Sequence, residues 1–237
     1  MRSGRIDVLS DVSCIINRGE FVSIAGPSGC GKSTFLKVVA GLITPDQGEV
    51  RLAQRPAQAG RRDVGILLQN PALLPWRTVL GNVMLSFRIF GEVSADAESR
   101  ALEVIRMVGL EKFRSAYPWQ LSGGMQQRTA LARLFAYAPS IQLMDEPFGA
   151  LDELTREHLN VELSRIHELV QKTVLFVTHS VQEAVLLSDR VLVMSPGNII
   201  GEVTVGLPRP RRSAMIDDGA FADATSQIRR LLSVARG

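Results

Sequence analysis

A run of small and polar residues between Ala25 and Phe35 has the composition of a phosphate-binding loop. The nine residues of this loop are Gly26, Pro27, Ser28, Gly29, Cys30, Gly31, Lys32, Ser33 and Thr34. Glycines let backbone N–H groups approach phosphate oxygens without a Cβ clash, and a following helix adds partial positive charge. Lys32 would hold the β- and γ-phosphates of ATP, and the Ser33 hydroxyl would ligate Mg²⁺. We therefore expect ATP binding and hydrolysis at this loop, although kinases, GTPases and motors share the motif.

Cys30 lies inside the loop and admits two interpretations. Its thiol could be oxidised and so block nucleotide entry, or its small side chain could fill a tight turn; we favour the second. Cys14 and Cys30 are the two cysteines of the sequence, and they form no disulfide framework.

Two carboxylates follow an apolar run that begins at Ile141. Asp145 would hold Mg²⁺, directly or through water, and Glu146 would polarise the attacking water as a general base. Gln142 is an unusual polar residue in such a strand, but side chains alternate, so it can face a polar neighbour.

The elements that must position these residues alternate between strands and helices. Strands are predicted at residues 21–25, 64–68, 141–144, 173–178 and 190–194, with a last hairpin strand after Pro196, and helices at residues 33–40 and 97–108. This order predicts an α/β fold with a mostly parallel sheet. Residues from about 71 to 138 look like a helical subdomain inserted in a domain of residues 1–206.

A C-terminal extension of residues 207–237 follows, where the composition shifts to Pro and Arg. Phe221, Ile228, Leu231 and Leu232 fall on one side of a possible amphipathic helix, which we expect to dock onto the core. We interpret the cluster of Arg209, Arg211 and Arg212 as a solvated tail in preference to a phosphate-binding patch.

The composition is that of a soluble globular protein, with 46% hydrophobic and 22% charged residues. No apolar run approaches the ~20 residues that span a bilayer. The net charge of +3 is too small to indicate nucleic-acid binding by itself. These features predict a cytoplasmic protein that reaches a membrane only through a partner.

The run Leu121-Ser122-Gly123-Gly124-Met125-Gln126-Gln127-Arg128 resembles the signature motif of the ATP-binding cassette (ABC) ATPases. The resemblance covers nearly the whole chain, because the other motifs of the family follow in the family's order. These are the loop at 26–34, the Q-loop residue Gln69, the pair at 145–146, the D-loop at 149–152 and the switch residue His179. The resemblance implies a P-loop NTPase with a RecA-like core, an antiparallel β edge and an inserted helical subdomain.

The resemblance also assigns site residues and a partner. It implies catalytic roles for Glu146, His179, Gln69 and Lys32, and it adds Gln69 to the Mg²⁺ ligands Ser33 and Asp145. Ser122, Gly123, Gly124 and Asp152 join the loop residues in nucleotide binding. Ser122 and the two glycines would open a helix and bind the γ-phosphate held by a second copy of the chain, in a head-to-tail dimer.

Two stretches, residues 73–80 and 144–152, resemble the nitrate/sulfonate/taurine importer subfamily. The resemblance implies an ATPase subunit on the cytoplasmic face of the bacterial inner membrane, bound to permease subunits and served indirectly by a periplasmic substrate-binding protein. Trp76 would anchor the permease contact or pack in the helical subdomain. The alternatives are a soluble ABC ATPase acting on nucleic acid or ribosomes, and a cassette that binds ATP without hydrolysing it. We expect no nucleic-acid partner.

Some positions depart from the family's pattern. No aromatic residue precedes Phe21, whereas family members carry one there that stacks on adenine, so the sequence begins too late or another group holds the base. Ser180 stands where the subfamily usually has Asp, and Gly81 where it usually has Glu. His158 and His167 lie on a helical stretch, and we expect both at the surface.

Overall fold

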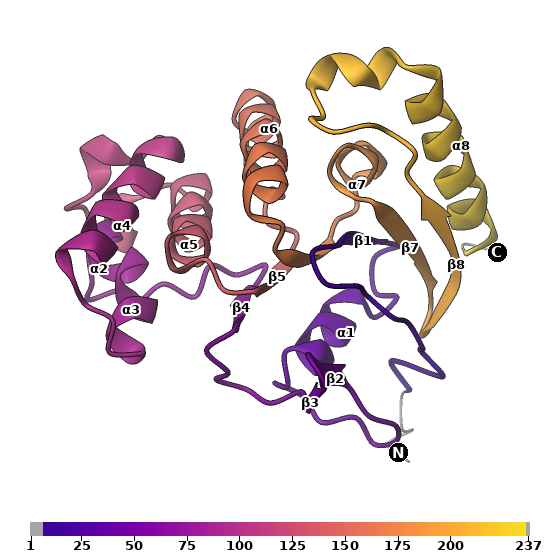
Figure 1. Ribbon diagram of the computed structural model, residues 1–237, viewed down its shortest axis with the longest axis horizontal. Helices are drawn as coiled ribbons and strands as arrows, with labels where there is room; N and C mark the ends of the chain where they lie inside the picture. Colours follow the sequence, from indigo (N-terminus) through magenta and orange to yellow (C-terminus); the bar gives the residue numbers. More distant parts are fainter. Residues whose placement is uncertain (1–6, 236–237) are drawn as a thin grey trace. The chain divides into compact units, whose positions relative to one another are not determined.

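The computed structural model describes residues 7–235, and it divides the chain into two compact units (Figure 1). The first unit comprises residues up to Gly60 together with those from Asn160 onward, and the second comprises Arg61–Leu159. The predicted helical insertion at about 71–138 falls within the second unit.

The strands and helices alternate along most of the chain. The strands are β1 (Phe21–Ala25), β2 (Arg51–Leu52), β3 (Arg55–Pro56), β4 (Val64–Leu67), β5 (Ile141–Asp145), β6 (Thr173–Val177), β7 (Arg190–Ser195) and β8 (Asn198–Thr204). The α-helices are α1 (Lys32–Val39), α2 (Val79–Val83), α3 (Leu85–Ile89), α4 (Ala95–Met107), α5 (Gly123–Tyr137), α6 (Glu153–Val170), α7 (Val181–Leu187) and α8 (Gly219–Val234). Three 3₁₀ helices are η1 (Glu111–Phe113), η2 (Pro118–Gln120) and η3 (Ser213–Asp217).

In the first unit, β1 lies between β6 and β7 and runs parallel to both. All five β1 residues are buried, which explains why four of them are apolar rather than alternating with polar ones, and the fifth, Ser23, hydrogen-bonds to Ser188 in the core. The strand β8 pairs antiparallel with β7, as the turn signal at Pro196 predicted, and the register shifts between Val193 and Met194. The short antiparallel β2–β3 pair is an element that the sequence analysis did not predict.

In the second unit, β4 and β5 pair in parallel, with Gly65 opposite Gln142. The Gln142 side chain is buried. The helix α5 packs against α2, α3, α4 and β4. Its apolar residues are interrupted by buried polar ones, Gln127 and Thr129, so that its helical pattern in the sequence is weak.

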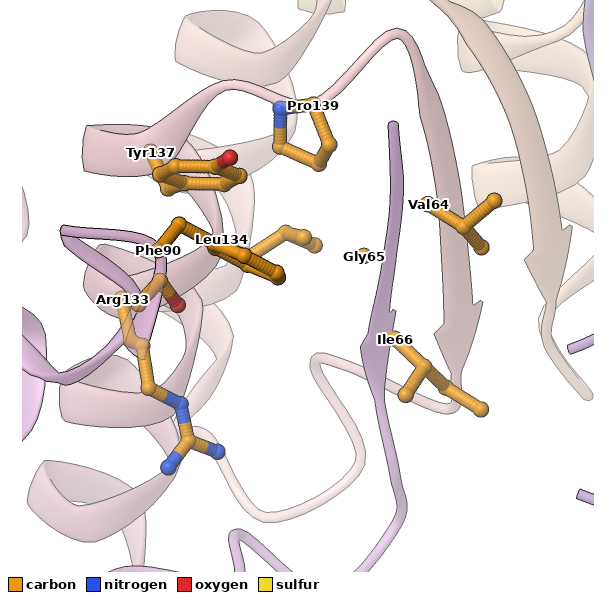
Figure 2. Close-up of a pocket in the computed structure, with 9 residues that line it drawn as sticks. Val64, Gly65, Ile66, Phe90, Arg133, Leu134, Tyr137 and Pro139 are labelled. Atoms are coloured by element: carbon orange, nitrogen blue, oxygen red, sulfur yellow. The ribbon is translucent and has the colours of Figure 1, made fainter. Parts of the chain in front are cut away.

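A small cavity in the second unit lies between β4 and the C-terminal end of α5. Figure 2 shows Gly65 facing Leu134 and Pro139, with Tyr137 stacked close to Phe90. Its volume of about 60 Å³ is far below the ~300 Å³ of typical small-molecule pockets. A Cβ on Gly65 would clash with Leu134 Cδ1 and lie 2.6 Å from Pro139 Cγ, so the close approach of strand and helix requires glycine here.

The C-terminal helix α8 packs on the first unit, as predicted. It lies against β7, β8 and α7, and in Figure 1 it runs alongside β8. Phe221, Ala224 and Ile228 are buried in the same cluster as β7 and β8 residues, with Leu231 and Leu232 packed partly against it. The amphipathic pattern therefore marks a docked helix.

The expectation of a solvated arginine tail is wrong. Arg211 is only 3% exposed, and its guanidinium donates to five backbone carbonyls, those of Val185, Leu186, Ser188, Val205 and Leu207. Arg209 donates to the Leu187 carbonyl and to the Asp189 carboxylate, at 3.0 and 2.8 Å. Both side chains therefore satisfy carbonyls that the end of α7 leaves unpaired. Arg212 is exposed.

The expectation for His167 is also wrong, whereas His158 is exposed as predicted. His167 is 5% exposed, with its ring edge-on to Phe21 at a centroid separation of 5.2 Å. Burial, and after it the charge of Arg209, lowers the pKa of His167, and this outweighs the opposing effect of Asp189. A helical pattern could not reveal this, because one histidine on a helix fits either face.

None of the helices within residues 7–235 combines the length and apolar character needed to cross a bilayer.

Candidate functional site

The phosphate-binding loop connects β1 to α1 in the first unit, as predicted. Gly29 and Gly31 have φ angles of 80° and 105°, a region that favours glycine, and Gly31 is the N-cap of α1. A Cβ on Gly26 would lie 2.6 Å from the Met194 carbonyl oxygen and 2.8 Å from Cys30 Sγ. The loop can therefore follow this tight path only with glycine at these positions, which exposes its backbone N–H groups to an anion.

Lys32 opens α1 and its side chain turns back over the loop. Its Nζ donates to the carbonyl oxygens of Gly26 and Pro27, both at 2.9 Å, and the side chain is 6% exposed. The ammonium thus lies beside the concave backbone of the loop, where it can attract phosphate oxygens. Ser33 follows in the first turn of α1, where its hydroxyl can serve as the Mg²⁺ ligand that the motif predicts.

Cys30 fills the tight turn, in agreement with the favoured interpretation. The residue is 2% exposed, its N–H donates to the Pro27 carbonyl, and its own carbonyl accepts from Gly197 N–H at 3.1 Å. Its Sγ lies 4.0 Å from Lys32 Nζ.

The predicted acidic pair ends β5 in the second unit. Asp145 is 2% exposed, so its side chain is buried at the C-terminal end of β5. Glu146 has a φ of 47°, a left-handed conformation that is uncommon for a residue with a Cβ. This conformation turns the chain at the end of β5, and the Glu146 carboxylate accepts a hydrogen bond of 3.2 Å from Gln69 Nε2. The structure thereby brings together the predicted general base and the Q-loop amide.

The signature motif forms the start of α5, as the resemblance implied. Ser122 is the N-cap, and its Oγ accepts from Met125 N–H at 3.3 Å. A Cβ added at Gly124 would lie only 3.1 Å from the Ala150 carbonyl oxygen, so this position accommodates a side chain poorly. The exposed N-terminus of a 15-residue helix is thus available to an anion.

Asp152 precedes α6 and caps it. Its Oδ1 accepts from Thr155 N–H at 2.9 Å, and this backbone hydrogen bond is the main reason that the pKa of Asp152 is lowered. The Asp152 carboxylate is therefore ionised at neutral pH and committed to the helix in this structure.

His179 follows β6 in the first unit, on a turn that two hydroxyl groups define. Thr178 Oγ1 accepts from Ser180 N–H at 3.0 Å, and Ser180 Oγ in turn accepts from Glu183 N–H and caps α7. Thr178 Oγ1 also donates to the Glu183 carboxylate at 2.5 Å. The turn leaves His179 exposed. Ser180, which departs from the subfamily's Asp, thus performs a capping role that Asp performs equally well.

Two features of the second unit escaped the sequence analysis. Gln126 ties the turn before α5 to the helix by donating to the carbonyls of Pro118 and Leu121. The rings of Tyr117 and Trp119 stack, with centroids 4.6 Å apart and an interplanar angle of 9°. The two aromatic residues stand two positions apart in the sequence, and this spacing was the signal that could have revealed the pair. Trp76 was assigned two possible environments, and it is 68% exposed rather than packed.

Comparison with known proteins supports the motifs. A family model described as ABC transporter matches residues 9–149. A taurine import ATP-binding protein of Rhizobium johnstonii is 42% identical over 97% of this chain and 88% of that protein. An aliphatic sulfonates import ATP-binding protein of Granulibacter bethesdensis is also 42% identical, over 98% of this chain and 90% of that protein.

A solved structure of a dimeric ATP-binding cassette, in a post-hydrolysis state bound to ADP and Pi, has a TM-score of 0.79 and 38% identity; the match covers 86% of this chain and 93% of that one. This similarity confirms the predicted α/β P-loop NTPase fold, with a mostly parallel sheet and an antiparallel edge. The family match covers more than half of the chain, and each relative matches almost the whole of it. The chain therefore belongs to the ABC transporter family, whose ATP-binding subunits hydrolyse ATP to power transport.

Proposed function

We propose that this chain is the ATP-hydrolysing subunit of a bacterial importer for taurine, a sulfonate, nitrate or a similar small solute. The hydrogen bond from Gln69 to the Glu146 carboxylate carries the catalytic part of the proposal, because it holds a general base at the end of a buried strand. The taurine and sulfonate import functions of the two relatives support the importer class and the solute class.

Hydrolysis needs groups that bind the phosphates, neutralise charge and orient water. The loop N–H groups and Lys32 would bind the β- and γ-phosphates, and their glycine-dependent geometry fits that role. Ser33, Asp145 and Gln69 would hold Mg²⁺, which when bound neutralises the developing phosphate charge. Glu146 would accept a proton from the attacking water.

Gln69 and His179 would sense the γ-phosphate. The Gln69 amide already donates to Glu146, so it can orient that carboxylate towards the water. His179 stands exposed on a turn fixed by Thr178 and Ser180, so its imidazole can reach a phosphate without a rearrangement of β6.

A second copy of the chain would complete each site. The N-terminus of α5, with Ser122 as its cap, is an exposed anion-binding end, and we assign to it the γ-phosphate on the loop of the other copy. The dimeric form of the solved relative supports this arrangement. Asp152 would lie near the junction of the two copies.

The remaining partners are membrane permease subunits, which in turn receive solute from a periplasmic binding protein. Trp76 is exposed on the loop that follows Gln69, and a large aromatic side chain of this kind suits an interface anchor. We assign the chain to the cytoplasmic face of the inner membrane, held there through the permease.

The substitution Ser122→Arg tests the shared site. It adds a bulky cation to an exposed helix N-terminus and should leave binding of ATP to the loop within about twofold while abolishing phosphate release. The matched control is Ser99→Arg, which places the same charge on the exposed face of α4 and should keep wild-type hydrolysis. Full hydrolysis by the Ser122 variant would refute the shared site.

A further inference from the structure

An exposed aromatic pair stands directly before the signature helix. Trp119 is 66% exposed and Tyr117 is 36% exposed, and their rings stack almost in parallel. Monomeric proteins gain little by leaving two stacked rings in water, whereas flat aromatic faces are the usual binding surface for nucleobases.

The pair is held rigidly on the helix that would bind the γ-phosphate. Gln120 Oε1 accepts from Tyr117 N–H at 2.8 Å, and Gln126 Nε2 donates to the Pro118 carbonyl at 3.0 Å. These bonds fix the short 3₁₀ helix η2 to the first turn of α5. The backbone that carries the two rings is therefore fixed before a ligand binds, which reduces the entropy cost of binding.

The spacing fits a nucleotide that is already bound at its phosphate end. Trp119 is three residues from Ser122, so their Cα atoms lie at most ~10 Å apart. Tyr117 covers one face of the Trp119 indole, which leaves the other face for a second flat ring. A purine joined to the γ-phosphate through a ribose and two further phosphates has a comparable reach.

We infer that Trp119, backed by Tyr117, stacks on the adenine of the ATP that the loop of a second copy holds. The inference rests on the proposed head-to-tail dimer, in which the N-terminus of α5 meets that nucleotide. It assigns a base-binding role to a surface continuous with the signature motif. Base recognition would then include a contact that forms only in the dimer.

Fluorescence can test this directly, because the sequence contains two tryptophans, Trp76 and Trp119. In a Glu146→Gln background, which prevents hydrolysis, Trp76→Phe leaves Trp119 as the sole tryptophan. Mg-ATP should quench its emission in step with dimer formation measured by light scattering, and UTP should quench less. The reciprocal Trp119→Phe chain should dimerise with ATP but show no such quenching from Trp76.

The substitution Trp119→Ala supplies a second readout. It should raise the ATP concentration for half-maximal dimerisation about 5- to 150-fold, the range for loss of one base–aromatic stack, and should reduce the preference for ATP over UTP. Trp119→Phe should restore most of both.

The outcomes separate this inference from the proposed function. Dimer formation by ATP without a change in Trp119 emission, and without an effect of Trp119→Ala, would overturn the inference and leave the shared site intact. Equal weakening with ATP and UTP would mean that the ring packs on protein, and would also overturn it. Failure of the Glu146→Gln chain to dimerise would overturn both.

Discussion

Replacement of the buried Arg211 is the perturbation whose effect the structure defines most closely. The side chain is 3% exposed, and its terminal nitrogens donate to carbonyls at the end of α7 and after β8, including Val185 at 2.9 Å and Leu207 at 3.3 Å. Burial, and after it the charge of Arg209, lowers the Arg211 pKa to about 10, so the guanidinium still carries its charge at neutral pH.

The magnitude follows from what Arg211→Met removes. Methionine retains an unbranched apolar stem but no donor, so the carbonyls around the two terminal nitrogens lose their partner. Hydrogen bonds to a charged group contribute about 1.5–3 kcal/mol each, so the loss of one bond from each of the two nitrogens suggests a destabilisation of about 3–6 kcal/mol. One bond per terminal nitrogen is the basis of this value, because several of the five hydrogen bonds are long and contribute less.

The assay is urea unfolding of the purified chain, followed by circular dichroism. The matched control is Arg212→Met, since Arg212 is the exposed neighbour and its replacement should change the unfolding free energy by less than ~0.5 kcal/mol. A loss below about 1 kcal/mol for Arg211→Met would refute the view that this guanidinium holds the C-terminal extension on the first unit.

Three further predictions use the same unfolding measurement. The free energy of unfolding should fall as pH drops below about 6.5, because His167 becomes protonated in the unfolded state while burial resists its protonation in the folded state. The variant His167→Phe should lose this pH dependence. An unchanged pH dependence in the variant would contradict the role of His167. Asp189 cannot cause this loss of stability near pH 6.5. Burial raises the pKa of Asp189, but hydrogen bonds from Phe21 N–H and Arg209 lower it by more. The stability that ionised Asp189 contributes is therefore lost only below about pH 3.8. Gly65→Ala should cost about 1–3 kcal/mol through its clash with Pro139, and no loss would show that β4 shifts freely. Ile228→Ala, at a fully buried position of α8, should cost about 2–5 kcal/mol, and a neutral result would mean that α8 is not docked.

Much of the fold was predictable because its core strands are largely apolar. The β1 and β6 strands could be read directly, and the glycine-rich loop between β1 and α1 predicted a phosphate site. The signature motif likewise predicted a helix that begins after Ser122, and the structure places Ser122 as the N-cap. These features are local, since each depends on residues adjacent in the chain.

The features that the sequence analysis missed depend on partners far away in the chain. The carbonyls that bury Arg211 come from α7 and from the segment after β8, so a cluster of arginines looked like a solvated tail. His167 is buried by Phe21, which lies far from it in sequence. The Gln69–Glu146 hydrogen bond joins the ends of two strands and was not expected from either motif alone.

A complementation assay can determine whether two copies of the chain share each ATP site. Lys32→Ala should remove phosphate binding in the loop, and Ser122→Arg should block the signature, so each variant alone should release no phosphate. In a mixture, one of the two sites of a heterodimer combines an intact loop with an intact signature. We expect that mixing restores part of the wild-type phosphate release. A mixture as inactive as its separate components would contradict it.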